Sequence, residues 1–296
     1  MRKQRKAYVY AIFAVLLWST VGSAFKITLR HYLYIRQLVM YASIVSTIIL
    51  ICLLVFSKKL GLLRAMTRKD YLHSALLGFL NPFLYYVVLF KAYSILPAQE
   101  ALTLNFTWPI MLVLLSVPLL NQNITLRGFL AITVSFMGVV VIGTRGDILG
   151  FRFTDVTGVL LGVGSSVIWA LFWIYNVRDH RDAVIKLFLN FAFGSCFIFI
   201  STVLFGEVQI PNFKGILGAV YIGLFEMGIT FLVWLKALKS SRTTAYVANL
   251  VYLVPFLSIV VIHFVVGEEI FCSTLIGLVL IVVGITLQKL CSSGGC

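Results

Sequence analysis

The sequence is dominated by apolar runs of about 20 residues, which recur ten times along the chain. Because a helix rises about 1.5 Å per residue, each run is long enough to cross the roughly 30 Å hydrocarbon core of a bilayer. The runs lack the period-two alternation of a membrane β-barrel, the other fold that satisfies backbone polar groups in lipid. They predict an all-α integral membrane protein with ten transmembrane helices, near residues 7–25, 34–56, 71–93, 98–118, 126–144, 155–176, 183–206, 213–237, 243–266 and 271–290.

Lysine and arginine are distributed unequally between the two sides of this arrangement. With the N-terminus inside, 17 of the 24 basic residues lie in the N-terminal tail, the even-numbered loops and the C-terminal tail, and 7 lie on the other side. This positive-inside pattern predicts a multi-pass protein of the cytoplasmic membrane with both termini in the cytoplasm. The densest basic clusters, residues 2–6 and 58–69, are placed to contact anionic lipid headgroups. The net charge of +14 therefore requires no nucleic-acid partner.

The cysteines give no sign of a disulfide framework or a metal site. Five are scattered along the chain, with no Cys-x-x-Cys pair and no histidine at ligand spacing. We therefore expect no metal and no cofactor. The basic, apolar N-terminus resembles a signal peptide, but its apolar run is long and nine more follow, so we interpret it as an uncleaved first span.

The chain carries an internal repeat. Residues 78–92 align without gaps on residues 223–237, with Gly, Val, Lys and Ala at matching positions. Further along, Pro109 and Gly138 correspond to Pro255 and Gly284. Because five spans per half is an odd number, the second half must enter the membrane from the opposite side. The prediction is an inverted repeat of two five-helix halves, residues 1–146 and 147–296, an arrangement typical of transporters.

Three prolines inside the predicted spans are candidate helix hinges, namely Pro82, Pro109 and Pro255. Proline in a helix interior deletes one backbone hydrogen bond and frees a carbonyl. A lone proline in a membrane helix can be a simple kink. Interruptions at corresponding positions of two halves, however, point to the binding site of a transporter.

Glu226 is the one acidic residue that falls in the middle of a predicted span. An ionised carboxylate there costs roughly 3 kcal/mol or more, so it should be protonated, paired or facing water. In the repeat Glu226 aligns with Asn81, and Thr230, one turn later, aligns with Tyr85. We expect these four residues to contact the substrate, and Glu226 to bind a substrate amine or to couple transport to protons. The alternative is a protonated glutamate that bonds a neighbouring helix.

Further polar and aromatic residues near the predicted breaks complete the candidate substrate site. Tryptophans deeper than the interfacial belt can stack on a flat or cationic ligand, and an asparagine at this depth can line a cavity. Each can equally serve helix packing. The candidates are Trp18, Asn105, Trp108, Trp169, Tyr246 and Asn249.

Several functional classes find no support in the sequence. No span holds a pair of aspartates, no His-x-x-x-His occurs, and no serine is placed with a histidine as a nucleophile and base, so no enzyme is indicated. A channel would favour rings of like residues and oligomeric symmetry, whereas the two halves here differ chemically. A channel or a non-transporting membrane partner stays open as an alternative.

Two segments resemble the EamA branch of the drug/metabolite transporter superfamily. They are Leu104-Asn-Phe-Thr-Trp-Pro109, and Tyr252-Leu-Val-Pro-Phe-Leu257 running to Gly267-Glu-Glu269. The first is similar to an element of a family member that exports aromatic amino acids and also accepts viologen-type cations. By this motif Asn105, Trp108 and Pro109 carry over as site residues, whereas Glu226 matches no pattern of the family.

The resemblance implies a central cavity lined by the first, third, fourth, sixth, eighth and ninth spans. It also implies a secondary transporter that works by alternating access and exports amino acids, including aromatic ones, or related small metabolites. Efflux of organic cations or drugs, or uptake of another metabolite, is the alternative within the same fold. The expected partners are a small-molecule substrate and membrane lipids, and we expect a monomer.

Overall fold

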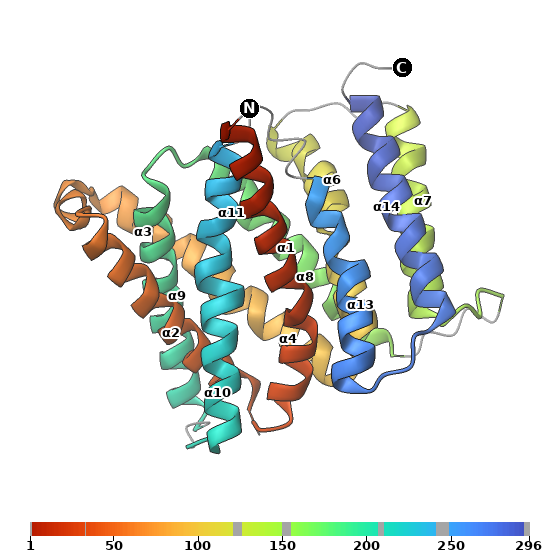
Figure 1. Cartoon of the computed structure of the whole chain (residues 1–296), viewed down its shortest axis with the longest axis horizontal. Helices are drawn as coiled ribbons and strands as arrows, with labels where there is room; N and C mark the ends of the chain where they lie inside the picture. The colour runs from red at the N-terminus through yellow and green to blue at the C-terminus, as the bar shows by residue number, and fades with distance from the viewer. Residues whose placement is uncertain are drawn as a thin grey trace.

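The computed structural model describes residues 2–32, 34–120, 126–149, 155–206, 210–240 and 249–292. Throughout these residues the regular secondary structure is helical, which confirms the all-α prediction. Helix α1 (Arg2–Leu29) begins at the same end of the bundle at which α14 (Cys272–Ser292) ends (Figure 1).

Six helical segments among the described residues are long and apolar enough to cross a membrane. They are Arg5–Leu29, Ile35–Phe56, Arg68–Ile95, Val156–Asn176, Ala183–Leu204 and Phe213–Trp234. Shorter apolar helices cover Ile132–Ile142, Leu253–Val266 and Cys272–Leu287. The chain is therefore a multi-pass membrane protein, and within the described residues six helical segments reach the full length of a span.

Two of the long segments contain a π-helical turn near their middles. In the first, α3 (Arg68–Gly78) passes through η2 (Phe79–Leu84) into α4 (Tyr85–Ile95). In the second, α10 (Phe213–Ile222) passes through η3 (Gly223–Gly228) into α11 (Ile229–Ser240). Asn81 has non-helical dihedral angles, φ −148° and ψ 119°, as expected for a residue that precedes a proline. The break predicted at Pro82 is thus present.

The predicted fourth span, residues 98–118, is two helices rather than one. Helix α5 (Ala98–Asn105) ends two residues before α6 (Trp108–Leu120) begins, so Pro109 is the second residue of a new helix. Pro255 likewise lies in the first turn of α13 (Leu253–Val266), directly after the short η4 (Asn249–Tyr252). A missing N–H is harmless in the first turn of a helix. Both prolines therefore lie at helix starts instead of kinking a continuous helix.

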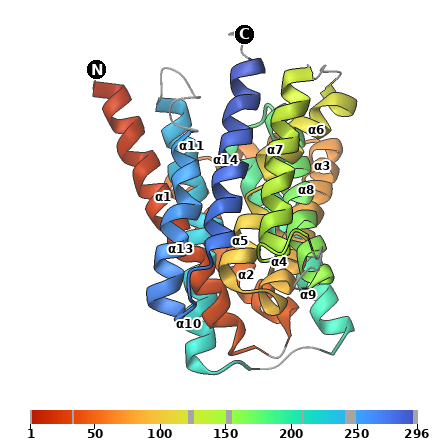
Figure 2. The ribbon, with the colours of Figure 1, turned by 90° about the vertical axis from the view of Figure 1, so that its right-hand side faces the viewer.

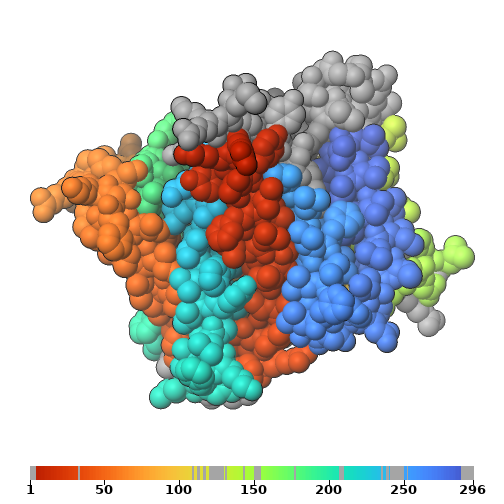
Figure 3. Space-filling view, viewed as in Figure 1, coloured from red at the N-terminus to blue at the C-terminus, as the bar shows by residue number. Residues whose placement is uncertain are grey.

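In the part of the chain that the structure describes, four further long helices and one short one complete the bundle. They are α2 (Ile35–Phe56), α7 (Leu126–Gly143), α8 (Val156–Arg178) and α9 (Ala183–Leu204), with the short η1 (Leu60–Ala65) after α2. Helix α1 packs on α10, α11 and α13, and Figure 3 shows it between them on one face. Helices α7 and α14 form an outer pair (Figure 2), while α9 packs on α2 and α3.

Glycine residues let several of these helix pairs approach closely. Helices in lipid gain no hydrophobic free energy by associating, so close van der Waals packing has to hold them together. A Cβ added to Gly138 of α7 would lie 2.5 Å from the carbonyl oxygen of Gly277 in α14. A Cβ on Gly158 of α8 would lie 2.6 Å from Leu96, and one on Gly162 would lie 3.0 Å from Leu104. The glycines of α8 thereby let α5 and the end of α4 approach closely.

Candidate functional site

A cavity of about 290 Å³ lies between α1, α4, α5, α6, α8, η3, α11, η4 and α13. Its wall is largely aromatic and aliphatic, and of the predicted site residues it includes Trp18, Tyr85, Asn105, Trp108, Trp169 and Glu226. The other lining residues are Val21, Phe25, Leu89, Tyr93, Leu102, Phe106, Trp173, Trp234, Val251 and Val254. Six of the ten predicted substrate contacts, separated by up to about 200 positions in the sequence, therefore share one cavity.

Glu226 projects from the π-helical segment η3 and is 7% exposed. Its Oε1 accepts a hydrogen bond of 3.2 Å from the Tyr86 hydroxyl of α4. Lysine, arginine and histidine are absent from the described residues that line the cavity. Glu226 is therefore the one ionisable carboxyl group on this wall, without a cationic side chain beside it.

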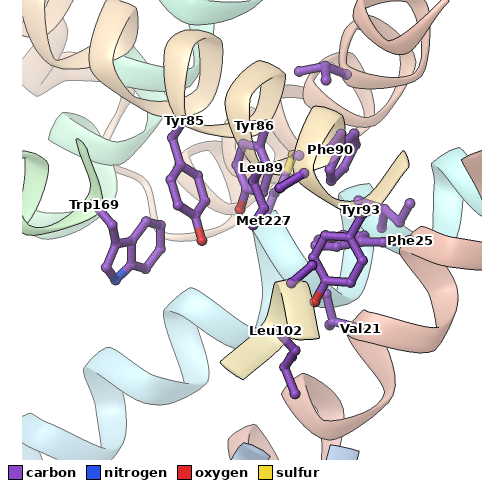
Figure 4. Packing of buried hydrophobic residues seen from close by; sticks show 14 of the residues in the cluster. Val21, Phe25, Tyr85, Tyr86, Leu89, Phe90, Tyr93, Leu102, Trp169 and Met227 are labelled. Atoms are coloured by element: carbon purple, nitrogen blue, oxygen red, sulfur yellow. The ribbon is translucent and has the colours of Figure 1, made fainter. Parts of the chain in front are cut away.

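Aromatic side chains from several of these helices line the cavity. Trp169 of α8 lies beside Tyr85 of α4, with ring centroids 4.6 Å apart and planes inclined by 34° (Figure 4). Trp18 of α1 contacts Trp234 of α11 at 5.4 Å between centroids. Because the face of an aromatic ring carries partial negative charge, such a wall attracts an organic cation. A flat molecule can also stack on it.

A short chain of hydrogen bonds fixes one wall of the cavity. The Tyr85 hydroxyl donates to Asn105 Oδ1 at 3.2 Å, and Asn105 Nδ2 donates to Ser165 Oγ at 2.8 Å. Two residues after Asn105, the Thr107 hydroxyl donates to Ser166 Oγ at 2.9 Å. These bonds join α4, the α5–α6 break and α8. Asn105 thus faces the cavity, but its amide group already bonds Tyr85 and Ser165. These bonds orient the Tyr85 side chain.

The other predicted contacts lie elsewhere. Asn81 is fully buried away from the cavity, and neither of its amide atoms has a hydrogen-bond partner among the described residues. The Thr230 hydroxyl donates to the carbonyl oxygen of Phe225, a backbone group within the π-helical turn. Tyr246 and the side chain of Asn249 lie outside the described part of the chain. The sequence repeat therefore matched positions whose surroundings differ.

Sequence reasoning missed several lining residues that helical spacing could have supplied. Tyr85, Leu89 and Tyr93 follow one another at intervals of four residues and all line the cavity. Trp234 lies eight residues after Glu226, also on one helical face. Tyr86 had no comparable signal, because its role depends on a partner 140 positions away.

Within the described residues, no group of three or more His, Cys, Asp or Glu side chains could hold a metal ion. Cys52, Cys196 and Cys272 are separate, exposed thiols. The site is therefore built from aromatic rings, a few hydroxyl and amide groups and one carboxyl group.

Comparison with known proteins places this chain in a recognised group. The chain is 31% identical over 224 residues to the uncharacterized transporter YvbV of Bacillus subtilis, covering 73% of this chain and 70% of that protein. It is 24% identical over 247 residues to YyaM, another uncharacterized transporter of the same organism, covering 80% and 78%. A protein of known crystal structure superposes with a TM-score of 0.65 at 23% identity over 97% of both chains, which is a likeness of fold.

The model of the EamA-like transporter family matches the chain twice, over residues 5–144 and 156–288. The two matches fall on either side of the connection between α7 and α8. Together they cover nearly the whole sequence, including every described element that lines the cavity. The chain belongs to the EamA-like transporter family.

Proposed function

We propose that this protein is a secondary transporter that exports a small organic solute through the aromatic cavity by alternating access. The observation that carries the proposal is the position of Glu226, a nearly buried carboxyl group facing a cavity near the middle of a membrane-spanning segment. Buried acidic groups at this depth mark substrate or proton pathways. A helical bundle that served only as a packing partner would have no need of such a group.

The fold we propose for this cycle is the ten-helix inverted repeat, with halves at residues 1–146 and 147–296. The two π-helical turns support it, because they lie at positions that the repeat aligns. A Cβ on Gly78 would lie 2.3 Å from the carbonyl oxygen of Asn190 in α9, and one on Gly223 would lie 2.5 Å from that of Ala42 in α2. Each broken helix is thus pressed against a helix of the other half.

An organic cation with a flat apolar part is the substrate class that fits the cavity best. The aromatic wall supplies cation–π contacts, and Glu226 supplies the opposite charge. An amino acid also carries a carboxylate, for which the described lining offers no cationic side chain. Amino acids remain the second candidate, supported by the similarity of the Leu104–Pro109 segment to an aromatic amino acid exporter.

The coupling that we propose is an exchange at Glu226, whose carboxyl group releases its proton when the substrate amine binds. The Tyr86 hydroxyl holds Oε1, which leaves Oε2 available to the cavity. From the distribution of basic residues, both termini face the cytoplasm, and the driving force for export is then entry of protons from outside. We take the working unit to be a monomer, since a complete cavity forms within one chain.

Transport by the purified protein in liposomes tests this proposal. The panel comprises a viologen, an aromatic amine, phenylalanine and tyrosine, each labelled and measured with and without a pH gradient. We expect Glu226→Gln to reduce pH-driven movement of the cations by about tenfold or more, equivalent to about 1.4 kcal/mol. The control Glu269→Gln removes a carboxylate that lies outside the cavity.

The outcomes separate the candidates. Movement of phenylalanine and tyrosine without movement of the cations would favour amino acid export. If Glu226→Gln left transport and its pH dependence unchanged, the coupling assignment would be wrong. If no solute of the panel moved, the non-transporting alternative would be favoured.

A further inference from the structure

The cavity is closed at the end of the bundle that lies away from the chain termini. A Cβ on Gly22 of α1 would lie 3.3 Å from Ile262 of α13 and 3.3 Å from the Tyr93 hydroxyl. Phe25 packs against Tyr93 with ring centroids 5.3 Å apart, and Figure 4 shows the Tyr93 hydroxyl directed towards Val21 and Leu102. Residues of α1, α4, α5 and α13 therefore form an apolar floor without room for a solute.

Polar contacts directly beyond this floor join the two halves of the sequence. Glu268, in the connection between α13 and α14, accepts hydrogen bonds from the backbone N–H groups of Ala98 at 3.0 Å and Gln99 at 3.5 Å. These are the first two residues of α5, whose N–H groups have no partner within their own helix. A carboxylate at a helix N-terminus is also favoured by the helix dipole.

Gln99 adds a second link between the same two segments. Its Nε2 donates to the carbonyl oxygen of Glu269 at 2.5 Å, and its Oε1 accepts from the backbone N–H of Phe271 at 3.1 Å. Gln99 is 1% exposed, so an open state of this end would have to offer both amide atoms other partners. The side chain of Gln99 thus holds the α13–α14 connection against α5.

Two cationic side chains bind groups at the same end of the bundle: Lys26 of α1, and Arg145 at the boundary between the two halves of the chain. Lys26 Nζ donates to the carbonyl oxygens of Tyr93 at 2.9 Å and Leu96 at 2.6 Å, at the end of α4. Arg145 donates from Nε to Glu100 at 2.8 Å, and its guanidinium lies 4.8 Å from the ring centre of Phe271. The network therefore spans α1, α4, α5, the end of α7 and the α13–α14 connection.

We propose that Glu268 and Gln99 form a latch that keeps this end of the transporter closed and must release for the cavity to open there. The inference rests on the proposed alternating-access function. The latch bonds join segments more than 160 positions apart, and Leu102 of the floor lies one turn beyond Gln99 on α5. Beside the latch lies an open pocket of about 470 Å³ lined by Lys26, Pro97, Arg145, Glu268 and Phe271, from which water can offer replacement hydrogen bonds.

Thiol labelling from the latch side measures opening directly. In a background with all five cysteines replaced by serine, Leu102→Cys places a thiol at the floor, where Leu102 is 5% exposed. A membrane-impermeant maleimide is applied to the membrane face opposite the termini. We expect Glu268→Gln to increase the labelling rate about tenfold, because the neutral amide is a weaker cap for α5. Glu269→Gln, which removes the adjacent carboxylate but no latch bond, should leave the rate within about twofold.

A second variant keeps the test decisive if Glu268→Gln does not fold. Gln99→Leu removes both amide bonds at similar volume and should raise labelling in the same direction, with size-exclusion profiles showing that each variant is monodisperse. Equal labelling rates in the parent, Glu268→Gln and Gln99→Leu would overturn the latch. Because labelling needs no substrate, accelerated labelling without any transport would contradict the proposed function and leave the latch supported.

Discussion

At the scale of single residues, the two copies of the repeat assign different environments to aligned positions. Asn81 is fully buried and its amide atoms have no hydrogen-bond partner among the described residues, whereas Glu226 lines the cavity and bonds Tyr86. Glu226 could be singled out from the sequence because an acidic residue in mid-span is costly. The sequence could not predict that Tyr86, rather than Thr230, would bond Glu226, because this depends on the direction in which the π-helical turn points the Glu226 side chain.

Tyr86→Phe tests whether that hydroxyl orients Glu226. The change removes one hydrogen bond to the carboxyl group and keeps the ring in its fully buried place. We expect proton-coupled cation transport to fall about fivefold or more and its pH optimum to move, while the protein folds normally. The liposome assay across a range of pH values measures both.

A control comes from another tyrosine. The Tyr71 hydroxyl donates to the carbonyl oxygen of Leu63 at 3.2 Å, far from the cavity lining. Tyr71→Phe should leave the pH profile unchanged. Identical pH profiles in Tyr86→Phe and the parent would show that the hydroxyl does not orient Glu226.

At the scale of helices, the sequence predicted the apolar segments well and their interruptions less well. Hydropathy gives the length of a span but not the end of helix α5 at Asn105, whose carbonyl oxygen would need an N–H from residue 109, which is a proline. Likewise, Pro109 and Pro255 were recognised as breaks, and the structure adds that each lies in the first turn of a helix. In both cases the interruption lies on the N-terminal side of the proline, because the missing N–H and the ring disturb the preceding turn.

The close contacts of Gly194 with the first π-helical turn, η2, lead to a prediction about stability. A Cβ on Gly194 of α9 would lie 2.3 Å from Pro82 Cδ and 2.8 Å from the carbonyl oxygen of Gly78. Gly194→Ala should therefore destabilise the protein by about 1–3 kcal/mol through overpacking. Thermal unfolding in detergent, followed by tryptophan fluorescence, measures the change.

Gly164 of α8 is the matched control, because a Cβ there would meet no atom within 4 Å. Gly164→Ala should raise stability by up to about 1 kcal/mol, since alanine loses less backbone entropy in a helix. Equal melting temperatures for the two alanine variants would contradict the close packing of α9 on η2.

At the scale of the whole molecule, charged groups join the two halves at both ends of the bundle. The latch lies at one end. At the other, Lys59 in the α2–α3 connection pairs with Asp182 in the α8–α9 connection at 2.6 Å. Asp182 also caps α9 by accepting from the N–H groups of Val184 and Ile185. The Lys59–Asp182 ion pair joins the ends of helices that already pack closely, so we expect it to stabilise the bundle and to stay intact during transport.

The pH dependence of this pair follows from Asp182. Partial burial raises the pKa of Asp182, but the hydrogen bonds from Lys59 and from the backbone outweigh it, so the net pKa lies below its ordinary value. A lowered pKa contributes stability above the unfolded value of about 3.9, and this contribution is lost as the pH falls through the folded value.

Asp182→Asn should therefore lower the melting temperature by about 1–2 °C at pH 7, since exposed pairs contribute up to about 1 kcal/mol. The difference from the parent should be the same at pH 5.5 and should shrink below about pH 4. Lys59→Met should have a similar effect, with no further loss in the double variant. A difference that persisted unchanged at pH 3 would show that the ion pair is not its cause.

The sequence by itself determined the membrane class and the helical fold, and it singled out Glu226 as an acidic residue in the middle of a span. These follow from local quantities, namely hydropathy, length, charge and the cost of an acidic group in lipid. Only the tertiary structure decided that Tyr86 binds Glu226, that Asn81 is sealed off, and that Glu268 holds α5. Each of these depends on contacts between segments far apart in the chain, where burial and hydrogen-bond geometry, not residue type, select the partner.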